Sequence, residues 1–307
     1  MFDLSKSRLE SLGIILPNDR LWTVKVLRDD LIDSDVSGNK WRKLKFNMEL
    51  VKSKKKDGIL TFGGAYSNHL VATAKACQVA GLSSIGLVRG EELDVNSNDT
   101  LRRCGDLGMK LLFISREEYG MRNDREYWDT LAADHPTYQI VPEGGANYYG
   151  MIGCQEILRS INPVDHVHVA CGTGTTAAGI ATGLSEDQTL HVYPVLKGID
   201  FRAEIKTLYA KSGIAAEMAE EFLDHVQIQD QFHFGGYGKI SDELIQFIRS
   251  VYHSSGLQLD PIYTGKAFYG MCHAEIDRDQ THVFIHTGGL QGIPGVEARM
   301  GEALFSA

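Results

Sequence analysis

The chain has 307 residues, 43% of them hydrophobic and 23% charged, which is an ordinary globular composition and enough length for two lobes with large cores. Its net charge of -9 opposes the broad basic face that a nucleic-acid partner needs. No window approaches the roughly 18 apolar residues of a membrane span, and the start resembles no signal peptide, so we expect a cytoplasmic protein with no membrane partner.

The first predicted helix begins directly after Lys40. Trp41, Leu44, Met48 and Val51 advance by three, four and three, which places them on one side of a helix. Gly38 and Asn39 form a turn signal before it, so Lys40 stands at the helix N-terminus, where the dipole disfavours an ammonium. This favours the neutral amine that forms Schiff bases. The alternative is that Lys40, Lys43 and Lys45 form one solvated face.

From Gly58 onward, short β-rich runs alternate with helical patterns. The runs are GILTFGG, SSIGLVRG, KLLFIS, YQIVPEGG, HVHVACG, LHVYPVL and HVFIHTGG. This order predicts an α/β protein with parallel twisted sheets flanked by helices. Because ligands of open parallel sheets bind beyond the carboxyl ends of the strands, the glycine turns that open the helices are the places to seek chemistry.

One such turn is FGGAYSNHL, residues 62–70. Ser67 and Asn68 place a hydroxyl, an amide and backbone donors at a helix start. They can simply cap the helix, or they can hold an anionic substrate carboxylate and a cofactor oxygen.

Another turn is ACGTGTTAAG, which follows the apolar strand HVHVA. Its glycines, free N–H groups and hydroxyls predict a phosphate cradle formed by Gly172, Thr173, Gly174, Thr175 and Thr176. Gly172, Gly174 and Ala177 also fit the dinucleotide pattern G-x-G-x-x-A. The next strand does not end in the acidic residue that would hold a ribose, although Asp200 lies a little beyond, so a nicotinamide oxidoreductase remains a weaker alternative.

The five cysteines are odd in number, widely scattered and never spaced as metal ligands: Cys77, Cys104, Cys154, Cys171 and Cys272. They predict reduced thiols and no metal site.

Seven ordered blocks resemble one family over nearly the whole chain: GNKWRKL, GGAYSNH, PEGGAN, CGTGTTAAG, GGYGKI, LDPIYTGKA and HTGG. The chain resembles the fold type II pyridoxal-phosphate enzymes of the 1-aminocyclopropane-1-carboxylate deaminase and D-cysteine desulfhydrase group. The resemblance implies pyridoxal 5'-phosphate as cofactor, a homodimer, and a two-lobed fold of the tryptophan synthase β type. The expected lobes are a large one of residues 1–54 and 156–307 and a small one of 55–155. The chain departs from the family in its short N-terminus and at Trp41, where a smaller or aliphatic residue is common, so its substrate range is expected to differ.

The same resemblance implies roles for single residues. Lys40 would carry the cofactor as an imine and move protons, Asn68 would bind the cofactor's phenolic oxygen, and residues 172–176 would hold its phosphate. Catalytic roles would fall to Lys40, Ser67, Tyr237 and Tyr263. The residues expected to face a small amino acid substrate are Ser67, Asn68, His69, Tyr237, Tyr263 and Thr287.

Thr264 and Thr287 decide between the two reactions of the group. The resemblance places Thr264 next to the cofactor's ring nitrogen, where cyclopropane-opening members have a glutamate, and Thr287 where they have a leucine. A hydroxyl leaves the ring nitrogen mostly neutral and the ring a weaker electron sink. This favours β-elimination, with D-cysteine giving pyruvate, sulfide and ammonia, over cyclopropane opening to 2-oxobutanoate and ammonia. A binding protein that keeps the cofactor without turnover is the non-enzyme alternative.

Overall fold

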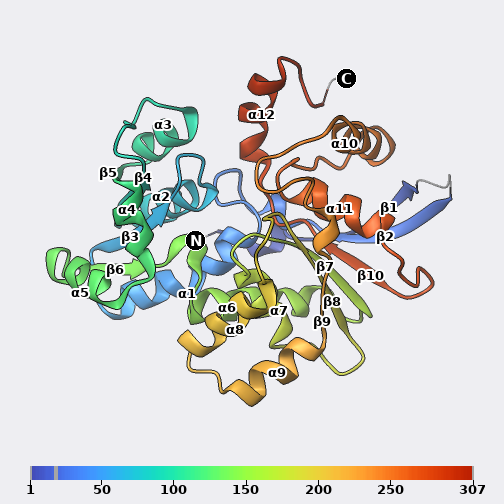
Figure 1. Ribbon diagram of the computed structural model, residues 1–307, viewed down its shortest axis with the longest axis horizontal. Coiled ribbons are helices and arrows are strands. Elements are labelled where there is room, and N and C mark those ends of the chain that lie inside the picture. Colours follow the sequence, from blue (N-terminus) through green and yellow to red (C-terminus); the bar gives the residue numbers. More distant parts are fainter. Residues whose placement is uncertain (1, 17–19, 306–307) are drawn as a thin grey trace.

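The structure is a computed structural model that describes residues 2–16 and 20–305, and within them the strands form two sheets (Figure 1). The six-stranded sheet has the order β1 (Leu9–Ile15), β2 (Leu21–Leu27), β10 (His282–Ile285), β7 (His166–Cys171), β8 (Thr189–Pro194) and β9 (Val226–Ile228). The four-stranded sheet has the order β5 (Met109–Ile114), β4 (Ser83–Arg89), β3 (Gly58–Gly63) and β6 (Tyr138–Val141). All pairs are parallel except β1 with β2.

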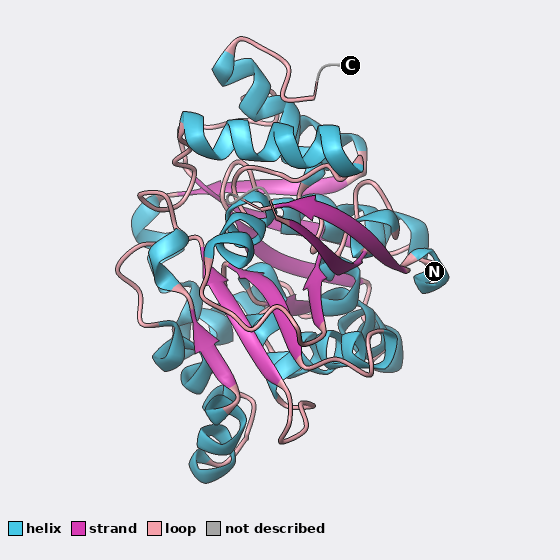
Figure 2. Ribbon diagram, turned by 90° about the vertical axis from the view of Figure 1, so that its right-hand side faces the viewer, coloured by secondary structure: helices cyan, strands magenta, loops and turns pink. Residues whose placement is uncertain are grey.

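Helices cover the faces of both sheets (Figure 2). The α-helices are α1 (Asn39–Ser53), α2 (Asn68–Ala80), α3 (Asp99–Asp106), α4 (Arg116–Gly120), α5 (Arg125–Asp134), α6 (Tyr148–Gln155), α7 (Thr175–Ala181), α8 (Phe201–Lys211), α9 (Ala216–Asp224), α10 (Asp242–Ser255), α11 (Thr264–His273) and α12 (Ile293–Met300). Short 3-10 turns lie between them: η1 (Leu4–Lys6), η2 (Asp29–Leu31), η3 (Met121–Asn123), η4 (Glu143–Gly145), η5 (Glu156–Ser160), η6 (Asp230–Phe232) and η7 (Leu290–Gly292).

The inner strands of the large sheet are buried on both faces, which is why their sequences are almost continuously apolar. Val167 and Val169 of β7 pack with α6, α7 and α8 on one face. On the other face Ala170, together with Phe284 of β10, packs against α10 and α11. The alternation of side chains along each strand thus builds two separate cores from the same strands.

The small sheet is built in the same way. Leu60 and Phe62 of β3 pack with residues of α4 and α5 on one face. Ile59 points to the opposite face, where it meets α1 and α2 in a cluster that includes the predicted stripe of Trp41, Leu44, Met48 and Val51. Trp41 also packs against Phe2, with ring centroids 4.8 Å apart, so its side chain belongs to the core.

The α/β alternation and the helix after Lys40 are confirmed by these elements. The sequence pattern missed the N-terminal strands β1 and β2. β1 pairs with β2, and β2 joins the sheet through β10, more than 250 residues later in the chain, as the register Val26 to Phe284 shows. A local sequence pattern does not predict pairing with a strand so far away in the chain. The division into lobes at residues 55 and 155 stays a prediction.

The five cysteines are free and buried, as expected for reduced thiols. Burial raises the pKa of Cys77, Cys104, Cys171 and Cys272 to about 12, which keeps these thiols protonated and unreactive at neutral pH. Among the described residues, no helix is both long and apolar enough to cross a membrane.

A buried ion pair fixes α1 to the large sheet. The Arg42 guanidinium donates to both carboxylate oxygens of Asp29, from Nε to Oδ2 at 2.6 Å and from Nη2 to Oδ1 at 2.7 Å. The side chains are only 2% and 0% exposed. Asp29 follows β2, and its backbone oxygen accepts from Gly38 N at 3.0 Å. The pair therefore sets where the N-terminal end of α1, with Lys40, lies.

Replacing Asp29 with alanine is expected to reduce the free energy of unfolding by about 3–5 kcal/mol, because it leaves the Arg42 guanidinium buried without its partner. Urea unfolding followed by circular dichroism measures this loss. The matched control is Glu92→Gln, which breaks the exposed pair with Arg116 and should cost at most about 1 kcal/mol. Equal losses in the two variants would contradict a structural role for the buried pair.

Candidate active site

Lys40 lies in the first turn of α1, held against the strand end that carries Thr287. Asn39 N donates to Thr287 O at 3.3 Å. Gly38, just before the helix, has φ of 62°, and a Cβ there would lie 1.9 Å from Thr287 O. Only glycine permits this approach, so the GN dipeptide of the sequence brings Lys40 next to the carboxyl end of β10.

The environment of Lys40 favours the neutral amine. Burial and then the nearby charge of Lys43 lower the pKa of Lys40 to about 7, while Asp260 and Cys154 oppose the shift. The predicted direction is thus the one found, and its largest cause is desolvation. The idea of one solvated lysine face is wrong, because Lys43 is buried and Lys45 pairs with Glu156 at 2.8 Å.

Asn39 joins Lys40 to the threonine-rich turn. The Lys40 Nζ donates to Asn39 Oδ1 at 2.6 Å, and Asn39 Nδ2 donates to Thr176 Oγ1 at 2.8 Å. In the same turn Thr173 Oγ1 and Thr175 Oγ1 lie 3.0 Å apart. The first-turn amides of α7 have no acceptor within that helix. The turn of residues 172–176 therefore presents hydroxyls and free amides within two hydrogen bonds of the lysine amine.

Lys43 supplies the cation that a phosphate needs. Its side chain is only 5% exposed, and burial lowers its pKa. It has no hydrogen-bond or ion-pair partner within the part of the chain that the structure describes. A buried ammonium without a counter-charge is costly, and a phosphate would supply that charge. Cys171, directly before the threonine-rich turn, acts on the pKa of Lys43, as does Cys154, so the ammonium lies close to that turn.

Ser67, Asn68 and His69 open α2. The Ser67 hydroxyl accepts from Leu70 N at 3.3 Å, so the capping role is present. Neither Ser67 nor Asn68 hydrogen-bonds to Lys40 or to residues 172–176 within the described chain. Their roles toward cofactor and substrate remain predictions.

His69 is buried and its tautomer can be assigned. Thr61 Oγ1 donates its one proton to Val141 O at 2.8 Å, so it accepts from His69 Nε2 at 3.0 Å. The Nδ1 atom is then an acceptor, and it has no hydrogen-bond partner among the residues that the structure describes. Burial, and then the charges of Lys43 and Lys40, lower the pKa of His69 to about 3. His69 is therefore neutral beside the two lysines.

Tyr237 and Tyr263 lie side by side, with ring centroids 6.0 Å apart and planes at 69°. Tyr263 precedes α11, and a Cβ on Gly172 would lie 3.2 Å from its ring. The threonine-rich turn and the two tyrosines therefore share one region, as their glycine-flanked blocks predict. Tyr237 is 51% exposed in this structure.

Thr264 begins α11, and its hydroxyl makes two hydrogen bonds to Asp260. Thr264 Oγ1 donates to Asp260 Oδ2 at 2.6 Å and accepts from Asp260 N at 2.9 Å. The Asp260 carboxylate also accepts from the backbone N–H groups of Ile262, Tyr263 and Thr264. Thr264 can therefore accept one further bond, but it has no proton left to donate.

Sequence reasoning missed Asn39, Lys43 and Asp260 as members of this site. All three stand in the quoted blocks GNKWRKL and LDPIYTGKA. The signal that could have found Lys43 is its position three residues after Lys40, one helical turn further along the same face.

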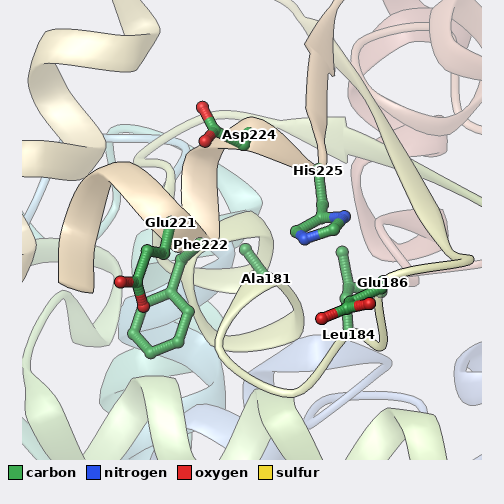
Figure 3. A pocket seen from close by; sticks show the side chains of 7 residues that line it. All are labelled: Ala181, Leu184, Glu186, Glu221, Phe222, Asp224 and His225. Atoms are coloured by element: carbon green, nitrogen blue, oxygen red, sulfur yellow. The ribbon is translucent and has the colours of Figure 1, made fainter. Parts of the chain in front are cut away.

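A separate pocket of about 330 Å³ lies at the other end of α7 (Figure 3). Glu221 and Phe222 of α9 line one side, with His225 and Glu186 opposite. None of the predicted site residues lines it. The chemistry assembled around Lys40 is therefore distinct from this acidic surface pocket.

Comparisons with known proteins identify the family of this chain. Residues 26–288 match the family model described as "Pyridoxal-phosphate dependent enzyme". A Pyrococcus abyssi protein named for 1-aminocyclopropane-1-carboxylate deaminase is 32% identical over 88% of this chain and 85% of its own length. The mitochondrial bifunctional D-cysteine desulfhydrase/1-aminocyclopropane-1-carboxylate deaminase of Arabidopsis thaliana is 31% identical over 91% of this chain and 74% of its own. A crystal structure of an ACC deaminase homologue covers 99% of this chain and 96% of its own, with a TM-score of 0.76 and 28% identity.

The chain belongs to the pyridoxal-phosphate dependent enzymes, in their two-lobed fold type II class. Within that class its relatives are the 1-aminocyclopropane-1-carboxylate deaminases and D-cysteine desulfhydrases, as the seven blocks indicate. The residues present fit the cofactor: the half-buried Lys40 amine with a lowered pKa for its aldehyde, and the buried Lys43 with the 172–176 turn for its phosphate.

Proposed function

We propose that this enzyme removes the β-substituent and the amine of a small amino acid, with D-cysteine giving pyruvate, sulfide and ammonia. The cofactor, when bound, supplies a ring that stabilises negative charge at the substrate's α-carbon. The observation that carries the proposal is Lys40, whose amine has a pKa lowered to about 7 and lies within two hydrogen bonds of the threonine-rich turn.

The residues of the site have separate roles toward the cofactor and the substrate. Lys40 would hold the cofactor, and its free amine would accept the α-proton at Nζ. Gly172, Thr173, Gly174, Thr175 and Thr176 bind the phosphate together with Lys43. Asn68 orients the ring oxygen, Ser67 and His69 lie on the substrate side, and Tyr237 and Tyr263 enclose the substrate and exclude water.

Thr264 and Thr287 support elimination over cyclopropane opening. Opening an unactivated ring needs deep delocalisation of charge, which a carboxylate at the ring nitrogen would promote. The position of that carboxylate holds the hydroxyl of Thr264, and the nearby Asp260 carboxylate is occupied by four donors of its own turn. The relatives named for both activities make cyclopropane opening the runner-up.

A side-by-side assay of keto acid release tests the proposal. D-Cysteine, L-cysteine, β-chloro-D-alanine and 1-aminocyclopropane-1-carboxylate are supplied to the holoenzyme at equal concentration. We expect pyruvate from D-cysteine and β-chloro-D-alanine at rates at least about tenfold above the others, because both carry a β-leaving group and share the configuration in the names of the D-cysteine desulfhydrase relatives. Faster 2-oxobutanoate release from the cyclopropane would establish the runner-up. A protein that holds the cofactor but turns over none of the four would be a binding protein.

A homodimer and a cytoplasmic location are further proposals, which rest on the resemblance to the family. Light scattering on the purified holoenzyme would decide the first. A mass equal to that of one chain would refute it.

A further inference from the structure

The loop of residues 233–238, which carries Tyr237, has an unusual backbone. Phe234, Gly235, Gly236 and Gly238 all have positive φ, of 52°, 86°, 113° and 70°. Glycine adopts such angles readily, but Phe234 does so at a cost. A loop with so many left-handed residues needs outside contacts to hold a single conformation.

A buried lysine on α11 supplies such contacts. Lys266 Nζ donates to the backbone oxygen of His233 at 2.9 Å and to that of Gly236 at 2.8 Å. Its side chain is 1% exposed. Burial lowers its pKa to about 8, an effect that the charge of Asp260 opposes. Burying an ammonium is costly, so its retention here calls for a reason.

The two carbonyls do not supply that reason. His233 O also accepts from Gly236 N at 3.0 Å, and Gly236 O accepts from Lys239 N at 3.2 Å. Both oxygens would therefore stay hydrogen-bonded if an apolar side chain replaced the lysine. What the ammonium adds is a link between the loop and α11.

That link lies close to the active site. Lys266 follows Thr264 by two residues on α11, and Tyr263 precedes the helix. On the loop, Tyr237 stands next to Gly236 and packs its ring edge-on against Tyr263. The loop is also anchored on its other side, where the Phe234 ring meets Tyr269 of α11 at 4.9 Å.

We propose that Lys266 is a positioning residue: it ties the 233–238 loop to α11 and so holds Tyr237 against Tyr263 at the substrate side of the site. The inference deepens the proposed function and rests on it, since Tyr237 is there assigned to the substrate. Lys266 itself does not touch the reacting atoms. Its effect on the reaction passes through Tyr237.

Kinetics of a double-mutant cycle test this coupling. Lys266→Met is expected to lower kcat/KM for D-cysteine on the order of tenfold, as for the loss of hydrogen bonds from a charged group. The change should fall on the same parameter, kcat or KM, that Tyr237→Phe changes. In the Tyr237→Phe background, Lys266→Met should add less than about twofold. Additive losses, or losses in the other parameter, would mean that Lys266 only supports the fold.

A second measurement does not depend on activity. Amide hydrogen exchange of the cofactor-free protein should show faster exchange in residues 233–238 of Lys266→Met, with α11 and the sheets unchanged. Lys266→Gln, which keeps an amide donor, should be intermediate and covers the case in which the methionine variant folds poorly. The matched control is Lys239→Met, which removes an exposed ammonium from the same segment and should change neither readout. Unchanged exchange in both Lys266 variants would overturn the inference. If the wild type releases no keto acid from any of the four amino acids, while residues 233–238 still exchange faster in Lys266→Met, the proposed function would be overturned and the positioning of the loop by Lys266 would stand.

Discussion

Replacing Lys40 with alanine is expected to lower kcat at least about a thousandfold and to abolish the visible absorbance of the purified protein. An ordinary lysine, with a pKa of 10.5, is neutral in roughly one molecule in three thousand at pH 7. Because the pKa of Lys40 is lowered to about 7, half of its amines are neutral there. The site thus raises the supply of the attacking amine by about three orders of magnitude, and alanine removes it entirely.

The absorbance spectrum and the rate of keto acid release check this result together. The visible band of the wild type should disappear on borohydride reduction and be absent in Lys40→Ala. The control is Lys52→Ala, a lysine on the same helix whose side chain is exposed, which should keep both the band and the rate. A coloured and active Lys40→Ala protein would refute the assignment, and a colourless wild type that binds a nicotinamide cofactor would favour an oxidoreductase.

The parts of the site that the sequence predicted are those in which local pattern determines local structure. The Gly38-Asn39 dipeptide predicts a turn, and the apolar periodicity after it predicts a helix, so Lys40 was expected at the start of that helix. Residues 172–176 had to follow an apolar strand and precede a helix. The meeting of the two was implied only by the resemblance to the family, and the Asn39 to Thr176 hydrogen bond is the contact that joins them.

What the sequence could not predict depends on contacts between distant segments. The pKa of Lys40 is lowered by burial and by the charge of Lys43. Neither effect can be predicted from the Gly38-Asn39 turn signal or from the apolar positions of the helix. Asp260 looks like any acidic residue until its carboxylate is seen to engage the Thr264 hydroxyl and three backbone N–H groups. Likewise β1 and β2 join the large sheet only through β10.

Four histidines lie together on one face of the large sheet: His166 and His168 on β7, His191 on β8 and His282 on β10. The rings of His168 and His191 stack at 4.5 Å, and those of His166 and His282 at 4.6 Å. Trp22, with Arg278 over its ring, packs against the edge of the cluster. This cluster gives the protein a predictable response to acid.

Each hydrogen bond between Tyr193, His168, His282 and Asp277 has one possible donor, so the ring nitrogen that carries the proton can be assigned in His168 and in His282. Asp277 O can only accept, so His282 donates to it from Nε2 at 2.7 Å and leaves Nδ1 as an acceptor. His168 then donates from Nε2 to His282 Nδ1 at 2.9 Å, and its own Nδ1 accepts from the Tyr193 hydroxyl at 2.9 Å. A proton added to either ring would set one N–H against another donor.

Burial, with the neighbouring histidines, therefore holds the pKa of His168 well below its ordinary value, and lowers that of His191 to about 4. The pKa of His282 is lowered mainly by burial, while Asp277 and Asp165 oppose the shift. In the unfolded chain these histidines bind protons near pH 6.5, whereas in the folded chain they do not. The folded state is therefore most stable above pH 6.5 and loses stability as the pH falls toward 4. The lowered pKa of His191 alone should reduce the free energy of unfolding by about 2 kcal/mol when the pH has fallen to 5.

We expect the free energy of unfolding in urea to fall by several kcal/mol between pH 6.5 and 5, a range below the one in which the lowered pKa values of Lys40 and Lys266 change stability. This window lies above the ordinary pKa of exposed carboxylates, so histidines dominate it. His191→Leu removes one of the titrating rings and should make the fall shallower by up to about 1.4 kcal/mol per pH unit. His253→Gln, at an exposed helix end, serves as control and should leave the steepness of the fall almost unchanged. A curve that stays flat down to pH 5 would show that the cluster accepts protons in the folded protein, contrary to the one-way chain of hydrogen bonds from Tyr193 to Asp277.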